Sequence, residues 1–532
     1  MINISSNVSA KPQGNFEQLR SNAKSDVLSG FLVFLIALPL CLGISLASGY
    51  PAIAGIITAI MGGLVTTFLS DSELTIKGPA AGLIVIALGC VTEFGFTGGM
   101  DLEKDYQAYR LALGVGVAAG VVQIFFGVFR AGILGEFFPI ATIHGLLASI
   151  GIIIVAKQFP VMLGLHPHGS PLELIASIPS FIINLNPLVS LIGILSLIII
   201  SSYSLIKNPK LKLIPVPMLM LLITIPIGLY FGIGEDKTYT FNNQIYQLKE
   251  HFLVNVPTNI VHALAFPDFS GLATETGIKY VILYSIIGSL ESLLSTKAVD
   301  ELDPWHRKSG LDRDLLSVGI ANTLAAFIGG LPMISEIVRS KANIDNGART
   351  RFANFFHGMF LLLSVALIPK AINHIPLASL AALLVVTGLR LASPKEFVHM
   401  YHLGKGQFIV FLSTIVGVLE TDLLKGIAIG IGANIIVHIF NGVSIFSFFK
   451  LNIEVQENDQ SAKILVRDSV IFSTWIPLRK HLYRFFQAEK RVDLDLSETR
   501  IVDHTVRSNI DEWEKKFNEK GLQLLVREVD DH

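Results

Sequence analysis

Long apolar runs follow one another through most of the chain, and they limit the fold more than any other feature of the sequence. Most of them approach the roughly twenty residues that a membrane helix needs. Because backbone groups in lipid must be satisfied within the spanning segment, the runs predict a polytopic α-helical membrane protein. The fourteen runs lie at 28–48, 50–69, 79–92, 110–130, 139–156, 187–206, 214–233, 277–296, 314–330, 335–344, 352–372, 376–391, 407–421 and 423–447.

The composition argues against several other classes of protein. Only 16% of the 532 residues are charged, against about 25% in soluble domains. The formal net charge of −1 gives no bulk attraction for nucleic acid, so no nucleic-acid partner is expected. Cys41 and Cys90 both fall in apolar runs, where packing explains them better than a disulfide or a metal pair. We therefore expect no metal site and no cofactor, apart from a coupling ion.

Basic residues gather in alternate connections between the runs, and this bias predicts the orientation. Placing both termini in the cytoplasm puts most of these residues inside and leaves the acidic loop 234–276 outside. The first 27 residues lack the apolar core and cleavage site of a signal peptide. The basic residues are Lys207, Lys210, Lys212, Lys297, Arg307, Lys308, Arg313, Arg349, Arg351, Arg390, Lys395 and Lys405.

A change of composition near residue 450 marks a second domain. Segments 463–472, 491–496 and 522–526 have the pattern of strands, and 509–520 that of an amphipathic helix ended by Gly521. This alternation predicts a small α/β domain of ~80 residues. The chain thus divides into a cytoplasmic segment 1–27, a membrane domain 28–450 and a cytoplasmic domain 451–532, in the plasma (inner) membrane.

The stretch 329–343 interrupts the apolar pattern and carries Glu336, Arg339 and Lys341. Two glycines and a proline at its start disfavour a continuous helix, and Ser335 is a candidate N-cap. We therefore expect an extended entry followed by a half-helix that begins inside the membrane. A helix start exposes backbone N–H groups and carries roughly half a positive charge, which makes it an anion site.

A similar stretch at 75–88 carries Pro79, which suits the first turn of a helix. Two short segments interrupted by Gly and Pro indicate a transporter binding site, although two kinked packing helices are the alternative. The charges and the pairing favour the site. We expect an anion to be held, mainly by backbone N–H groups, at Gly78, Pro79, Ala80, Ala81, Ser335, Glu336, Ile337, Val338, Arg339 and Ser340.

Motifs in the membrane domain and the tail resemble the sulfate permease (SulP) family of inorganic anion transporters. They are Lys77-Gly-Pro-Ala-Ala81, Ser289-Leu-Glu-Ser-Leu-Leu-Ser295, Val338-Arg-Ser-Lys-Ala-Asn-Ile-Asp-Asn-Gly-Ala-Arg-Thr350 and, similar to a STAS domain, Asp495-Leu-Ser-Glu-Thr-Arg-Ile-Val-Asp503. The resemblance implies fourteen segments in two inverted repeats of seven, divided between a core and a gate domain. It also implies a homodimer that carries sulfate, bicarbonate, chloride or dicarboxylates, with the third and tenth segments as half-helices facing each other across the substrate.

The chain departs from this family at three places. Glu336 stands where many members have a small neutral residue, and Lys77 where a small polar residue is usual. Asp503-His-Thr505 replaces the Asp-Ser-Ser of STAS domains that are phosphorylated, so we do not expect regulation by serine phosphorylation.

Two carboxylates near the expected anion site indicate coupling to a cation. Glu291 lies inside the run 277–296, where burial costs on the order of 3 kcal/mol unless the group is paired, protonated or hydrated. The resemblance to the sulfate permease family implies that an acidic residue at the position of Glu291 lies beside the substrate and, in some members, helps to bind a coupling cation. Arg339 shares a helix face with Glu336 and could supply positive potential to an anion. The alternatives are a neutral acid packed between helices for Glu291 and an arginine extended to the cytoplasm for Arg339.

The predicted function is secondary transport of sulfate or bicarbonate. No nucleotide-binding or hydrolytic motif occurs, so the protein is not expected to be an enzyme. Ionised Glu291 and Glu336 would repel an anion unless Na⁺ or H⁺ bound with it, which predicts symport with Glu291, Ser295 and Glu336 as the cation site. Bicarbonate is slightly favoured, since a monovalent anion needs less positive charge. An exchanger, a channel-like conductor and a membrane sensor remain as alternatives.

Overall fold

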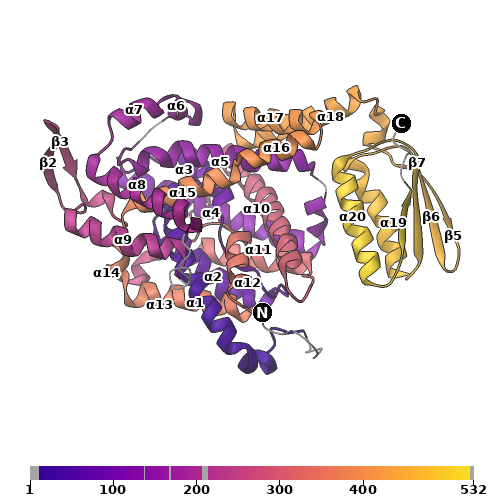
Figure 1. Ribbon diagram of the computed structural model, residues 1–532, viewed down its shortest axis with the longest axis horizontal. Helices are drawn as coiled ribbons and strands as arrows, with labels where there is room; N and C mark the ends of the chain where they lie inside the picture. Colours follow the sequence, from indigo (N-terminus) through magenta and orange to yellow (C-terminus); the bar gives the residue numbers. More distant parts are fainter. Residues whose placement is uncertain (1–10, 137, 167–168, 206–213, 528–532) are drawn as a thin grey trace. The chain divides into compact units, whose positions relative to one another are not determined.

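The computed structural model describes residues 11–136, 138–166, 169–205 and 214–527, and the predicted basic positions Lys207, Lys210 and Lys212 lie outside them. In the described residues a helix overlaps each of the fourteen apolar runs (Figure 1). These helices are α1 (Phe16–Ala47), α2 (Ile53–Leu69), α3 (Ile84–Glu93), α4 (Leu102–Val128), α5 (Ile140–Met162), α8 (Pro187–Ser202), α9 (Val216–Phe231), α10 (Glu275–Leu302), α11 (Leu311–Phe327), α12 (Ile337–Asp345), α13 (Phe352–Leu367), α15 (Leu377–Leu391), α17 (Lys405–Glu420) and α18 (Leu423–Phe440).

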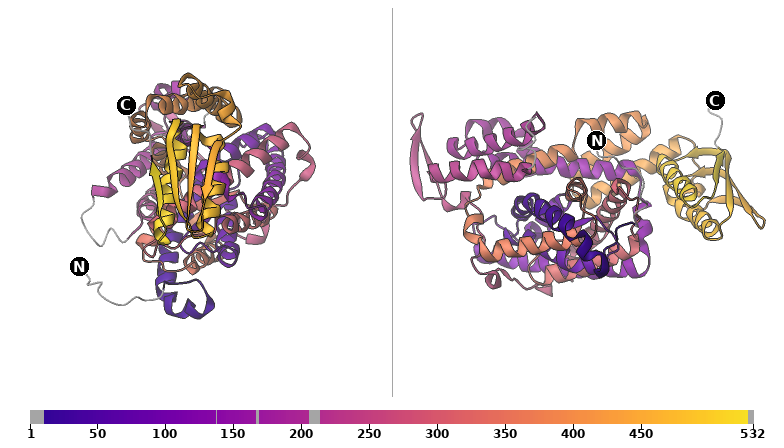
Figure 2. Two further views of the ribbon diagram at one scale, coloured as in Figure 1. Left: turned by 90° about the vertical axis from the view of Figure 1, so that its right-hand side faces the viewer. Right: turned by 60° about the horizontal axis from the view of Figure 1, so that its bottom comes forward.

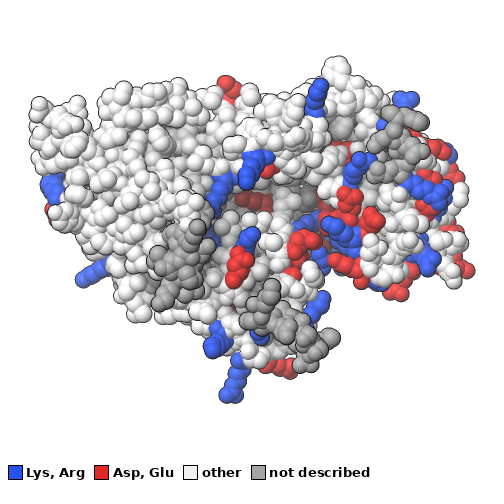
Figure 3. Space-filling view, viewed as in Figure 1, with Lys and Arg blue, Asp and Glu red and all other residues white. Residues whose placement is uncertain are grey.

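Six helices in the described part of the chain are long and apolar enough to cross a membrane, and further apolar helices are shorter. The helical face drawn in Figure 3 is mostly white, whereas Lys, Arg, Asp and Glu side chains crowd the C-terminal α/β domain. Large apolar side chains such as Phe125, Ile183 and Phe440 are exposed on the helices, as expected where lipid rather than water is the solvent. The fourteen crossings in two repeats of seven stay a prediction.

Helix α1 begins at Phe16, twelve positions before the apolar run that predicted it. The Asn15 side chain accepts a hydrogen bond from the backbone N–H of Gln18 at 2.8 Å and so caps this early start. Residues 16–27 are polar, but most of them favour helix, and hydropathy marks only the part of a helix that is apolar. The remaining short helices are α6 (Pro171–Ala176), α7 (Ile178–Ile183), α14 (Pro369–Ile372) and α16 (Pro394–His402).

Residue contacts divide the chain into two compact units, Met1–Gly132 with Ile150–Leu391, and Ile133–Ser149 with Ala392–His532. In the first unit, small residues let helices approach closely. A Cβ at Gly120 of α4 would lie 2.7 Å from the backbone nitrogen of Thr323 on α11, and one at Gly63 of α2 would lie 2.7 Å from Cα of Gly358 on α13. This close approach is how packing stabilises helices that gain little from the hydrophobic effect in lipid.

The first unit contains two segments with the same order of elements. Helix α2 leads into strand β1 (Ile76–Pro79) and then α3, and α11 leads into strand β4 (Met333–Glu336) and then α12. The two strands pair antiparallel, with Lys77 opposite Ser335 and Gly78 opposite Ile334. A hairpin of β2 (Lys237–Phe241) and β3 (Gln244–Leu248) lies in the long loop that precedes α10.

This pairing corrects two predictions about helix starts. Pro79 is not in the first turn of a helix but ends β1, and a 3₁₀ turn (Ala81–Leu83) precedes α3. Ser335 is not an N-cap, because it belongs to β4 and Glu336 occupies the cap position without a side-chain cap bond. Both errors have one cause: the preference of a residue for a helix start is local, and it is weaker than the strand pairing that both segments gain together.

The C-terminal part of the second unit is a small α/β domain. Its sheet has the order β5 (Asn452–Glu457), β6 (Ser461–Val470), β7 (Arg491–Val502) and β8 (Leu524–Arg527), seen face-on in the left view of Figure 2. Helices α19 (Trp475–Gln487) and α20 (His504–Glu519) cover one face of this sheet (Figure 1). Their buried Trp475, Phe485 and Phe517 form its core with the strands. Strand β5 and helix α19 were not predicted, and a STAS identity stays a prediction.

Candidate functional site

The site begins with the β1–β4 ladder, which joins the two interrupted segments. In an antiparallel pair the end of one strand lies beside the start of the other, so Pro79 lies opposite Met333 and Glu336 opposite Ile76. The turn that starts at Ala81 and helix α12, which starts at Ile337, therefore leave from opposite ends of the ladder, roughly 10 Å apart for four residues. Two helix starts at this spacing could offer backbone N–H groups to an anion from two directions.

Arg339, in the first turn of α12, reaches back to the other segment. Its Nη2 donates a hydrogen bond to the carbonyl oxygen of Pro79 at 3.0 Å, and its Nη1 lies 3.6 Å from Sγ of Cys41. The side chain is 1% exposed, so it does not extend to an interface. Gly78 makes room for it, because a Cβ there would lie 2.3 Å from Nη1. The guanidinium thus brings a fixed positive charge to the end of β1.

The two predicted carboxylates lie near this guanidinium. Glu336 Oε1 is 3.7 Å from Arg339 Nη2, an ion pair that is too long for a hydrogen bond. The Glu291 carboxylate from α10 lies against the turn after β1, since a Cβ at Gly82 would be 2.2 Å from Oε1. Glu291 and Glu336 also interact electrostatically. Among the described residues, neither Oε2 of Glu291 nor Oε1 of Glu336 accepts a hydrogen bond, which leaves oxygens for a bound ion or proton.

The remaining predicted site residues fall into four groups. Ser295 is buried one helical turn beyond Glu291, on the same side of α10. Ser340 is occupied by the fold, since its hydroxyl accepts a hydrogen bond from the Ile76 N–H at 2.8 Å and donates to the Glu336 carbonyl. Ile337 and Val338 have exposed side chains, so only their backbone N–H groups could face an anion. Ala80 and Ala81 connect β1 to the 3₁₀ turn and supply only backbone.

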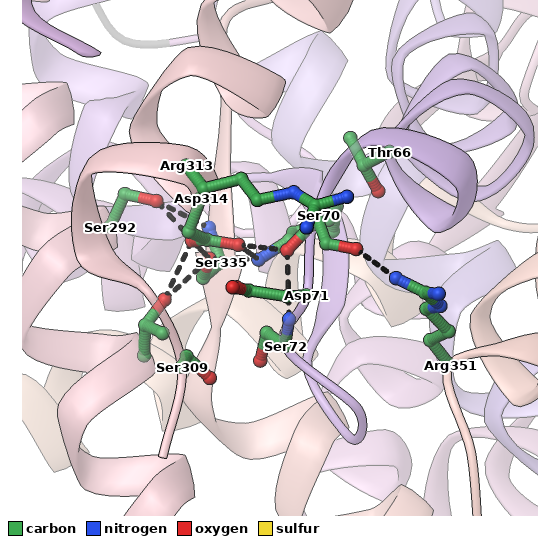
Figure 4. Close-up of polar contacts among 12 residues, drawn as sticks. Thr66, Ser70, Asp71, Ser72, Ser292, Ser309, Arg313, Asp314, Ser335 and Arg351 are labelled. Atoms are coloured by element: carbon green, nitrogen blue, oxygen red, sulfur yellow. Dashed lines mark hydrogen bonds and ion pairs between the residues drawn. The ribbon is translucent and has the colours of Figure 1, made fainter. Parts of the chain in front are cut away.

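Ser335 lies in a different polar cluster from the one predicted. Its hydroxyl is 2.6 Å from Nζ of Lys77 and 3.0 Å from Oδ2 of Asp314, and hydroxyls of Ser292 and Thr296 lie within hydrogen-bond distance of it. Figure 4 shows Ser70 and Ser335 beside Asp314, with Ser292 next to Ser335. The Ser335 hydroxyl is therefore committed to this cluster and is not an obvious ligand for a coupling ion.

Sequence reasoning missed Asp314 and undervalued Lys77. Their side chains are both 1% exposed and form an ion pair of 2.6 Å between Nζ and Oδ1. Asp314 is the first residue of the apolar run 314–330 and was not singled out. The available signal was an unmatched lysine in an apolar surrounding, because a buried lysine requires a carboxylate partner. Lys341, by contrast, is exposed.

In the part of the chain that the structure describes, no three His, Cys, Asp or Glu side chains lie together as a metal site. A coupling Na⁺ prefers oxygen ligands, as other hard cations do. The carboxylate oxygens of Glu291 and Glu336 that accept no hydrogen bond among the described residues suit such an ion, and they equally suit a proton. The site therefore combines one fixed cation, Arg339, with two carboxylates whose charge can change.

Comparisons with known proteins show which family and which fold this chain resembles. The model of the sulfate permease family matches residues 23–414 of the chain. A putative sulfate transporter, YvdB of Bacillus subtilis (strain 168), is 26% identical over 415 residues, which are 77% of this chain and 72% of the relative.

Solved structures of transporters share the fold. The transmembrane domain of a cyanobacterium bicarbonate transporter, BicA, matches with a TM-score of 0.63 and 22% identity, covering 80% of this chain and 100% of that one. The structure of SLC26A9 matches with a TM-score of 0.67 and 12% identity, covering 97% and 85% of the two chains. Together with the six long apolar helices, these likenesses establish an integral multi-pass membrane protein.

Proposed function

Because the chain belongs to the sulfate permease family, a family of transporters and not of enzymes, we propose that it is a secondary transporter of a small oxyanion, sulfate or bicarbonate, coupled to Na⁺ or H⁺. The observation that carries the proposal is the position of Arg339. Its guanidinium from one half-helix contacts the Pro79 carbonyl of the other segment, beside two carboxylates that each have an oxygen without a hydrogen bond among the described residues. Substrate enters between the two helix starts and is held by backbone N–H groups and this guanidinium.

The charges near the site explain why a cation is needed. Lys77 adds no net charge, since Asp314 lies 2.6 Å from it. Arg339 contributes one positive charge, and Glu291 and Glu336 contribute two negative charges when both are ionised. An anion then meets a net repulsion, which one bound Na⁺ or proton removes. Coupling is reciprocal: the cation raises the affinity for the anion by the same factor as the anion raises the affinity for the cation.

The balance of charge favours bicarbonate slightly over sulfate. When one Na⁺ or proton neutralises one of the two carboxylates, the charge of Arg339 is just enough to neutralise the other. Little positive charge is then left to hold a divalent anion. Similar proteins are named for either substrate, a putative sulfate transporter and a bicarbonate transporter. We propose that the site is exposed to either side by rocking of a core domain, in a homodimer in the plasma membrane with both termini cytoplasmic.

The proposal is tested by uptake into liposomes that contain the purified protein. We expect labelled bicarbonate to enter faster with an inward Na⁺ gradient or an inward proton gradient than with neither. Uptake of labelled sulfate is measured under the same conditions for comparison. Uptake that ignores both gradients would rule out symport. Electrical recording on the same liposomes then separates exchange, with slow and coupled turnover, from a channel-like conductor.

The C-terminal domain gives a separate prediction. We propose that it is a STAS-like packing and partner-binding module, because its buried apolar residues pack against one another within the domain. Its helix α20 also begins at His504 and Thr505 rather than at a serine pair that could be phosphorylated. Truncation after Lys450 should lower the amount of protein in the membrane and the fraction of dimer, with little change in substrate affinity. A truncated protein present in normal amount but with sharply altered affinity would contradict this role.

A further inference from the structure

The Lys77 side chain lies in an environment built from oxygen atoms. Its Nζ is 2.6 Å from Oδ1 of Asp314 and 2.6 Å from Oγ of Ser335. Asp314 Oδ1 also accepts a hydrogen bond from the Ser70 hydroxyl at 2.6 Å, and its Oδ2 accepts one from Thr296 at 2.9 Å. One carboxylate and several hydroxyls around a buried positive charge resemble the ligands of a small hard cation more than the surroundings of an ordinary lysine.

The cluster joins elements that are distant in the sequence. Lys77 is on β1 and Ser335 is directly opposite it on β4, while Asp314 is on α11. Thr296 comes from α10, and Ser70 follows the end of α2. Figure 4 shows Ser70 and Ser335 approaching Asp314 from different elements. The ammonium thus links the two strands, from which both helix starts leave, to helix α11.

The cluster is separate from the proposed transport site. Lys77 directly precedes Gly78, which contacts Arg339, and Ser335 directly precedes Glu336. Among the residues that the structure describes, the ammonium bonds to Asp314 and Ser335, and not to Arg339, Glu291 or Glu336. A shift of either strand would nonetheless move the guanidinium and the carboxylates that flank the anion. Lys77 is in this sense a positioning residue.

We propose that Lys77 is a tethered cation: its ammonium fills an oxygen-lined site for a monovalent cation, formed by Asp314, Ser335 and the hydroxyls around them. It holds β1 and β4 together whatever ions are in solution. A buried carboxylate that loses its partner is strongly destabilising. Removing the side chain should therefore leave a site that free Na⁺ can enter, whereas replacing it by methionine, an unbranched apolar chain of similar length, should block that site.

The test measures thermal unfolding of the full-length purified protein in NaCl and in choline chloride of equal concentration. All variants carry Glu291→Gln, so that Na⁺ at the proposed coupling site does not contribute, and Glu291→Gln alone is the reference. In choline, Lys77→Ala should lower the melting temperature by about 5 °C or more, and Na⁺ should restore at least half of that loss. Lys77→Met should lose as much stability and gain nothing from Na⁺.

A double variant keeps the test decisive if Lys77→Ala does not fold. Lys77→Met with Asp314→Asn removes both charges, so it should melt above Lys77→Met alone and show no Na⁺ response. A double variant no more stable than Lys77→Met, or a Lys77→Ala protein that gains no more from Na⁺ than the reference, would overturn the proposal. Because no transport is measured, failure of the symport proposal leaves this result unaffected, and the reverse also holds.

Discussion

Arg339→Ala should lower the uptake of the transported anion about 10- to 100-fold at substrate concentrations below KM. The reason is the loss of a charge-assisted hydrogen bond to the anion, which is worth about 1.5–3 kcal/mol, where each 1.4 kcal/mol is a factor of ten. Because the guanidinium is buried, we expect no cation on the protein surface to take over its role in the variant. Initial rates of labelled bicarbonate and sulfate uptake, measured over a range of concentrations in liposomes, give the change in affinity and in maximal rate separately.

The same helix offers a matched control. Lys341→Ala removes a positive charge two positions further along α12, where the side chain is exposed, and it should leave uptake near that of the wild type. A loss of similar size in both variants would mean that the total charge of the region matters and not the position of Arg339. Unchanged uptake and affinity in Arg339→Ala would remove this residue from the anion site.

Glu291→Gln should make anion uptake independent of the coupling gradient. The amide has the shape of the carboxylate, so the contact with Gly82 is kept, but it can neither bind a proton nor attract Na⁺. Accumulation of anion against its gradient should then fall at least about tenfold, the effect of losing roughly 1.4 kcal/mol of coupling free energy, while downhill exchange of anion across the membrane continues. Uptake with and without the gradient that drives the wild type measures both quantities.

A carboxylate at the end of the same helix serves as the control for this variant. Glu301, with a side chain 62% exposed, pairs with Lys308, and Glu301→Gln should keep the full dependence on the gradient. Glu336→Gln shows whether the second carboxylate shares the role. If Glu291→Gln responds to the gradient as strongly as the wild type, Glu291 is not a coupling group, and Glu336 becomes the candidate.

Much of the architecture follows from local properties of the sequence. The apolar runs become helices because a segment surrounded by lipid must satisfy its own backbone groups, and this requirement does not depend on the rest of the fold. The interruptions at Pro79 and at 329–332 were recognisable because Gly and Pro act on the backbone where they stand. The alternation of apolar residues after 451 predicted an α/β domain in the same local way, although it did not reveal strand β5 or helix α19.

The tertiary structure alone decided how the site is assembled. Strand pairing joins Ile76–Pro79 to Met333–Glu336, and Arg339 donates to a carbonyl 260 positions away. Asp314 was not recognised from the sequence, because its partner Lys77 lies 237 positions earlier. Hydrophobic periodicity and helix capping act over a few residues, whereas these contacts exist only once distant segments have packed together. The sequence therefore determined which residues are unusual, and the fold determined which of them lie together.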